Sequence, residues 1–118
     1  MSDRPGTRAL AAALGVANLF LVARPDAVLS AVSVRAPRPP RWVVRLLGAR
    51  VVLQEAAVIA VPSRRLVLGG ALVDGLHAAS MVLAAVAWPQ HRRAAAISAV
   101  TAAASAALEV ATAPADGA

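Results

Sequence analysis

Five polar residues interrupt two of the most apolar stretches of this 118-residue sequence. Arg50, Gln54 and Glu55 lie in one stretch, and Asp74 and His77 lie in the next. Guanidinium, carboxylate and imidazole groups can pair with one another or pass on a proton or ion, and inside a membrane segment they mark functional sites by default. Whether they can do so here depends on the helices that carry them.

The spacing of these residues predicts a cluster. Asp74 and His77 are three residues apart and Arg50 and Gln54 are four apart, so each pair shares a helix face. If residues 62–65 turn the chain back, Arg50 lies level with His77, and Asp74 lies level with Gln54. Helical rise then places Asp74 about 13–16 Å from the turn, near the middle of a bilayer. We expect an ion pair between Arg50 and Asp74, with Gln54 and His77 completing its hydrogen bonds.

Glu55 fits this cluster poorly, because five residues place it about 140° around the helix from Arg50. It could face another helix, face another subunit, or stay protonated. A functional cluster would be a proton or ion relay or a polar substrate site. The opposing interpretation is a neutralised network that fixes helix register. We favour the latter here because Arg45 and Arg50 balance Glu55 and Asp74.

Four apolar stretches would carry these side chains. The sequence is 59% hydrophobic and 15% charged, whereas soluble domains are about a quarter charged. A chain this short could not hide so much apolar surface in water. The expected fold is all-α, a four-transmembrane-helix bundle that forms a single integral membrane domain over residues 1–118. The approximate spans are residues 8–24, 42–61, 66–88 and 94–113.

The connection between the first two spans is the longest. Residues 27–34 are apolar but too short to cross a bilayer, so we expect a short interfacial or re-entrant helix there. Residues 35–41 form a basic, proline-rich linker. Trp42 and Trp88 should reach the same membrane face, since tryptophan prefers the interface. Six loop arginines on that side against four on the other lean weakly towards an N-terminus outside.

Small residues are expected to form the contacts between helices. Gly48 lies in the second span. In the third span Ala71, Gly75 and Ala79 follow a small-xxx-small pattern, which lets helix backbones approach closely. A second seam of small and hydroxyl side chains follows one stripe of the last span: Ser98, Thr101, Ala102, Ser105 and Glu109. Because Glu109 is near the end of that span, exposure at the interface is its simplest explanation.

Other chemistry is sparse. The sequence has no cysteine and its two histidines are far apart, so we expect no metal site. Its arginines flank apolar runs and it has only three aromatic residues, so nucleic-acid binding is not expected despite a net charge of +6. No nucleophile–base pair is visible, so we expect no enzyme activity, no catalytic residue and no cofactor.

One segment resembles a known pattern. Arg45-Leu-Leu-Gly-Ala-Arg50, followed by the sequence RRLVLGGALVDGLH from Arg64 to His77, is similar to small uncharacterised bacterial four-helix integral membrane proteins. These carry G-x-R in the second helix and an intramembrane Asp in the third. The resemblance covers about residues 41–88 and singles out Gly48, Arg50 and Asp74. It implies a four-helix bundle in a bacterial cytoplasmic membrane, and it implies no reaction.

These observations lead to two functional expectations. The first is a non-enzymatic accessory or structural subunit that packs against itself or a larger membrane complex, because the loops are short and the interior is neutralised. The alternative is a small proton- or ion-coupled transporter that uses Arg50, Asp74 and His77. The expected partners are the lipid bilayer and either a membrane protein or further copies of the chain.

Overall fold

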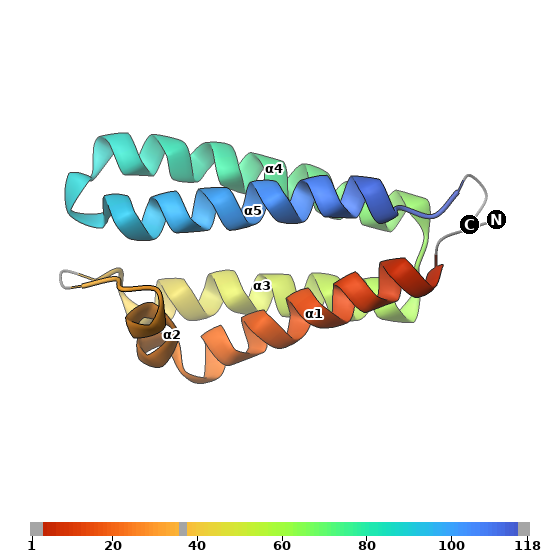
Figure 1. The fold of residues 1–118 in the computed structure, drawn as a ribbon, viewed down its shortest axis with the longest axis horizontal. Coiled ribbons are helices and arrows are strands. Elements are labelled where there is room, and N and C mark those ends of the chain that lie inside the picture. Colours follow the sequence, from red (N-terminus) through yellow and green to blue (C-terminus); the bar gives the residue numbers. More distant parts are fainter. Residues whose placement is uncertain (1–3, 36–37, 116–118) are drawn as a thin grey trace.

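The computed structural model describes residues 4–35 and 38–115, and the all-α prediction is confirmed for them. Four long helices and one short helix follow one another along the chain (Figure 1). A single 3-10 turn, Pro89–His91, joins the last two long helices. The α-helices are α1 (Arg4–Ala23), α2 (Pro25–Ala31), α3 (Arg41–Ala60), α4 (Arg64–Ala87) and α5 (Arg92–Thr112). The long helices begin and end within four residues of the predicted spans.

Proline and serine set several helix boundaries. Pro25 occupies the first turn of α2, where its missing N–H leaves no hydrogen bond unmade. Pro62 follows α3 and Pro89 follows α4, and neither residue can continue the preceding helix. Ser63 caps α4, because its hydroxyl accepts a hydrogen bond from the Leu66 N–H at 3.2 Å.

The long helices form two layers of antiparallel pairs (Figure 1). In one layer α1 packs along α3, and in the other α4 packs along α5. The chain turns back between α3 and α4 as expected, but these two helices lie in different layers and touch little. Gly48 explains the α1–α3 pairing, because a Cβ there would lie 3.0 Å from Val22 Cγ2 and 3.1 Å from the Asn18 carbonyl oxygen.

The two layers meet at the end of the molecule that holds the α3–α4 turn. A buried apolar cluster lies there, formed by Ala11, Val58 and Val67. The Thr7 hydroxyl also donates a 2.6 Å hydrogen bond to the Thr112 carbonyl oxygen, which ties α1 to the last residue of α5. This end of the bundle is therefore the closed end.

The opposite end carries α2 and the basic connection. The expected short helix between the first two spans is present as α2, and Leu29, Val34 and Val44 form a buried cluster beside it. Asp26 in its first turn pairs with Arg38 at 3.9 Å and with Arg41. Two arginines of the expected basic linker, one in its middle and one at its end, are thus ion-paired with α2. Residues 36 and 37 of the linker lie outside the described residues.

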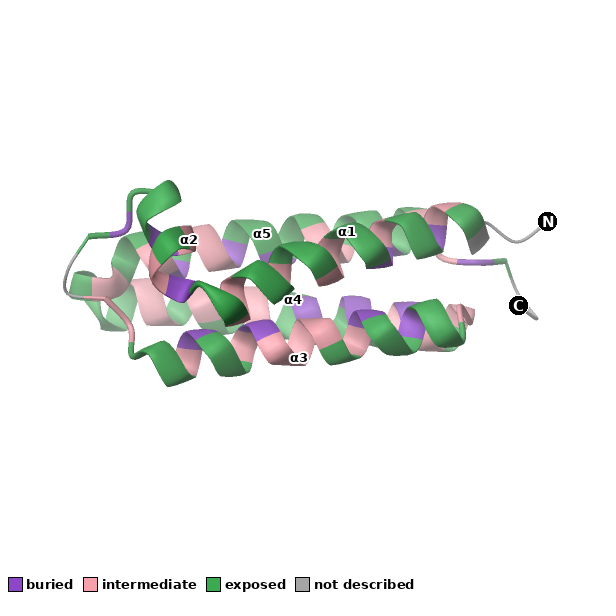
Figure 2. Cartoon of the chain, turned by 90° about the horizontal axis from the view of Figure 1, so that it is seen from below, coloured by how far each residue is buried: buried purple, intermediate pink, exposed green. Residues whose placement is uncertain are grey.

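Among the described residues, three helical segments are long and apolar enough to span a membrane: Pro5–Ala23, Arg64–Ala87 and Pro89–Thr112. The segment predicted as the second span, now α3, does not qualify, because charged residues interrupt it. Large apolar side chains are exposed on all four long helices; Leu53, Leu83 and Val86 are 72%, 71% and 73% exposed. Figure 2 marks exposed residues along each of these helices. Such surface suits lipid rather than water, which is the mark of a membrane protein.

The predicted small-residue seam of α4 does not hold the helices of this chain together. Ala71 is buried, but Gly75 and Ala79 are exposed, and no atom lies within 4 Å of where a Gly75 Cβ would be. The inward face of α4 instead carries Val67, Gly70, Ala71 and Asp74. Since successive helical residues are about 100° apart, burying Asp74 turns Gly75 outward.

The predicted seam of α5 is realised in part. Ala102 and Glu109 are buried and Ser98 and Ser105 are half-buried, but Thr101 is exposed. The Thr101 hydroxyl donates to the Ile97 carbonyl oxygen of its own helix at 2.9 Å, so it links no helices. The alanines on the inner face of α5 allow α4 to pack closely.

Candidate functional site

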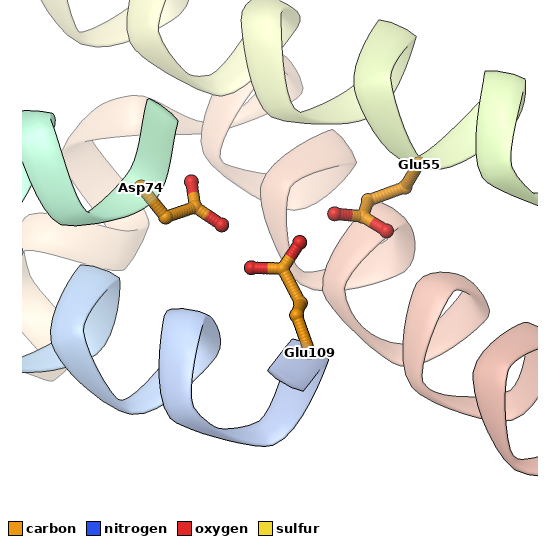
Figure 3. A group of neighbouring side chains, drawn as sticks. All are labelled: Glu55, Asp74 and Glu109. Carbon is orange, nitrogen blue, oxygen red and sulfur yellow. The ribbon is translucent and has the colours of Figure 1, made fainter. Parts of the chain in front are cut away.

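Three carboxyl groups meet inside the bundle. Glu55 comes from α3, Asp74 from α4 and Glu109 from α5, and they are only 2%, 3% and 3% exposed. One oxygen from each lies within 4.8 Å of the others. In Figure 3 the Glu109 carboxyl group points into the space between the other two side chains. We call these three residues the carboxyl cluster.

The structure places Arg50 against the carboxyl cluster. Its NH2 group lies 3.4 Å from Asp74 Oδ1, which is the pairing expected from the sequence. Its NH1 group also donates to Gln54 Oε1 at 3.2 Å, one turn along the same helix. Arg50 therefore bridges the two layers, because α3 and α4 otherwise make little contact.

Gln54 connects the other two carboxyl groups. Its amide nitrogen donates to Glu55 Oε1 and to Glu109 Oε2, each at 3.4 Å. Gly70 of α4 leaves the room for this link, since a Cβ there would lie 2.8 Å from Gln54 Nε2 and 3.0 Å from Glu109 Oε2. A single amide thus serves two acidic side chains at the centre of the cluster.

His77 lies beside the cluster but is held differently from the expectation. Its Nε2 atom makes a 2.8 Å hydrogen bond with the Ser98 hydroxyl of α5, rather than completing the hydrogen bonds of Arg50 and Asp74. The reason is the pairing of the helices, because α5 and not α3 packs along α4. The histidine therefore joins α4 to α5 one turn away from Asp74.

Two expectations about charge are wrong. Glu109 is buried rather than exposed at an interface, because the end of α5 is covered by the contact of Thr7 and by Pro114, which is fully buried. Arg45 also does not balance an acid of the cluster, since it lies on the outside and donates to the Val22 carbonyl oxygen at 3.2 Å. The described residues thus place one guanidinium against three carboxyl groups.

One atom shows the resulting deficit of hydrogen-bond donors. Glu109 Oε1 is buried and has no hydrogen-bond partner among the described residues. An ionised carboxylate can only accept hydrogen bonds, so adjacent carboxylates cannot satisfy one another. A bound proton would let one carboxyl oxygen donate to the next, and a bound cation would serve the same oxygens. The site therefore needs further positive charge.

Glu109 was not predicted to belong to the site, although the sequence places it on one stripe of the last span with small and hydroxyl side chains. The direction of Glu55 was left open, and the structure buries this side chain beside α1, where a Cβ added at Gly15 would lie 3.5 Å from Glu55 Cβ.

The family resemblance of residues 41–88 rests on three positions. Gly48 lies in the contact between α1 and α3, and Arg50 and Asp74 lie against one another. Their placement does not test the resemblance, which stays a prediction. Comparison of the chain with protein-family models, curated proteins and solved structures finds no match.

Proposed function

We propose that this protein takes up and releases protons at the carboxyl cluster as a small proton transporter in a membrane. The observation that carries the proposal is the buried, unpartnered Glu109 Oε1 atom beside two further buried carboxyl groups. A merely structural network would be expected to pair its polar atoms.

Protons supply the missing charge at the lowest energetic cost. An ionised side chain at the membrane centre costs at least ~2.5–3.5 kcal/mol, and a carboxyl group avoids that cost by binding a proton. Within residues 4–35 and 38–115, the charged and titratable groups that face the cluster are Arg50 of α3 and His77 of α4. The only charged residues of α1, Arg4 and Arg8, lie at its N-terminal end, far along the helix from Gly15. Proton number can therefore change within the cluster itself.

In this proposal all four long helices cross the membrane. Although α3 is interrupted by charge, α1 covers one side of it and Arg50 and Glu55 point towards the interior groups described above. Trp42 and Trp88 are exposed, and both lie at the α2 end, as an interfacial belt requires. The excess of arginine at this end favours its placement on the cytoplasmic side of a bacterial membrane, with α2 at the interface.

Proton flux through reconstituted vesicles tests the proposal. The wild-type chain should dissipate an imposed pH gradient, measured with an enclosed pH-sensitive dye. The variant Glu55→Gln/Asp74→Asn/Glu109→Gln should slow this to the rate of protein-free vesicles, because no group in the cluster can then exchange a proton. Asp26→Asn is the matched control, since Asp26 is a partly exposed acid at the α2 end, and its flux should equal that of the wild type.

Equal flux in the wild type and the triple variant would contradict the proposal. So would saturable binding of sodium or calcium ions by the wild type that is lost in the triple variant, with no proton exchange. That result would assign the cluster to a metal cation instead.

A second candidate is the accessory or structural subunit expected from the sequence. The outward face of α4 favours this second candidate. Gly75 has open space around it there, and Ala79 is exposed one turn further along the helix. Small residues at this spacing suit the close approach of a helix from another chain. Since Gly75 and Ala79 do not serve packing within the chain, a partner helix would give them a role.

The native mass in mild detergent tests this candidate. The wild type should be recovered as an oligomer or with a stoichiometric partner, and Gly75→Leu should release it as a monomer. Gly69→Leu is the control, because Gly69 has equally open surroundings on another face of α4 and should leave the mass unchanged. A monomeric wild type would argue against a subunit role.

A further inference from the structure

A large cavity separates the two layers. Its volume is about 800 Å³, within the usual range of small-molecule sites. It runs from Arg50 and Asp74 to residues of α2 and to Trp88, at the end of the bundle that carries α2. Helical rise places Trp88 about 20 Å from Asp74. The walls are mostly apolar and include Leu14, Leu21, Val44, Leu47, Met81 and Ile97.

The inner end of the cavity is polar. Arg50, Asp74, His77 and Ser98 line it there. The two charged groups are not equally accessible, because the Arg50 side chain is 30% exposed and that of Asp74 only 4%. A molecule in the cavity therefore meets the guanidinium group before the carboxylate.

The guanidinium group of Arg50 also has N–H donors that its contacts with Asp74 and Gln54 do not fully use. Both of its contacts with Asp74 go to the same oxygen, Oδ1, at 3.4 and 3.5 Å. A strong arginine–carboxylate pair has shorter bonds and uses two oxygens. A guanidinium group carries five N–H donors, and those of Arg50 are only loosely engaged. A second anion at the inner end would find both charge and donors.

We propose that this cavity binds an amphiphile with a single anionic headgroup, of the alkyl carboxylate class. Its chain would lie against the apolar walls, and its carboxylate would accept hydrogen bonds from Arg50. An elongated, apolar cavity that ends in one accessible cation matches this shape and charge. The small hydroxyl and imidazole groups of Ser98 and His77 supply further polar contacts for the headgroup.

Such a ligand would be coupled to the proton site, and this step rests on the proposed function. A carboxylate that engages Arg50 weakens the hold of Arg50 on Asp74. The three carboxyl groups then lie side by side with their cation engaged elsewhere, and the carboxyl cluster binds a proton. One proton is taken up for each anion bound, so that the pair enters the site without net charge.

Binding and proton uptake should be measured together on the full chain in lipid nanodiscs, with dodecanoate as the probe. We expect saturable binding, with about one proton taken up per dodecanoate in weakly buffered solution. Arg50→Gln should weaken the affinity at least about tenfold, since hydrogen bonds to a charged partner are lost. Arg45→Gln should bind like the wild type, because Arg45 lies on the outer surface.

Because Arg50→Gln could impair folding, a second pair of variants tests the cavity itself. Met81→Trp fills the cavity and should abolish saturable binding, whereas Val82→Trp adds the same ring to the exposed side of the helix and should not. Equal affinity for dodecanol or dodecyltrimethylammonium, or equal uptake by Met81→Trp, would overturn the ligand assignment. Arg50-dependent binding without proton uptake would retain the ligand site and overturn its coupling to the carboxyl cluster.

Discussion

Replacing Glu109 with glutamine should leave the bundle folded while abolishing proton flux. The amide has nearly the shape of the carboxyl group, but it carries no charge and brings N–H donors to the atom that now has no partner. We expect the free energy of unfolding to rise by about 1–2 kcal/mol, because an unsatisfied buried group is removed. Flux should fall at least about a hundredfold if Glu109 transfers the proton directly.

Thermal unfolding in detergent and the decay of a pH gradient in vesicles are the two measurements required. A stable variant without flux would separate the functional role of Glu109 from a packing role. If Glu109 were kept for stability, its replacement should not raise the free energy of unfolding. An unfolded variant, or a stable one with full flux, would contradict the proposed role.

Arg50→Gln should have the opposite effect on stability. It leaves three buried carboxyl groups without a cation, and removing one partner of a buried ion pair costs about 3–5 kcal/mol. The loss should be greatest at alkaline pH and should shrink as the pH falls, because protonated carboxyl groups carry no charge. Denaturant unfolding in detergent across a range of pH would show this dependence.

The double variant Arg50→Gln/Asp74→Asn is the control for this prediction. It removes one negative charge together with the positive one, and should recover a substantial part of the lost stability. If the double variant is no more stable than Arg50→Gln, Arg50 acts through packing rather than through its charge. The same follows if the stability lost in Arg50→Gln does not change with pH.

The sequence by itself determined the helices and the positions of their polar residues relative to the turns. Proline at positions 25, 62 and 89 ends or begins helices because of its own covalent geometry, whatever the fold. The pairing of Arg50 with Asp74 was also predictable, since the turn at residues 62–65 and the constant rise of a helix place the two residues about one helical turn apart along the bundle, within reach of a long side chain. These features depend on local geometry.

Tertiary structure decided which faces of the helices meet. Glu55 lies well around α3 from Arg50, yet both reach the interior, because α3 touches α1 within its layer and faces α4 and α5 across it. The same two-layer packing brings Glu109 to the cluster and His77 to Ser98, and it turns Gly75 outward. Sequence spacing defines angles around one helix axis, but the arc that is buried depends on how many neighbouring helices surround that axis.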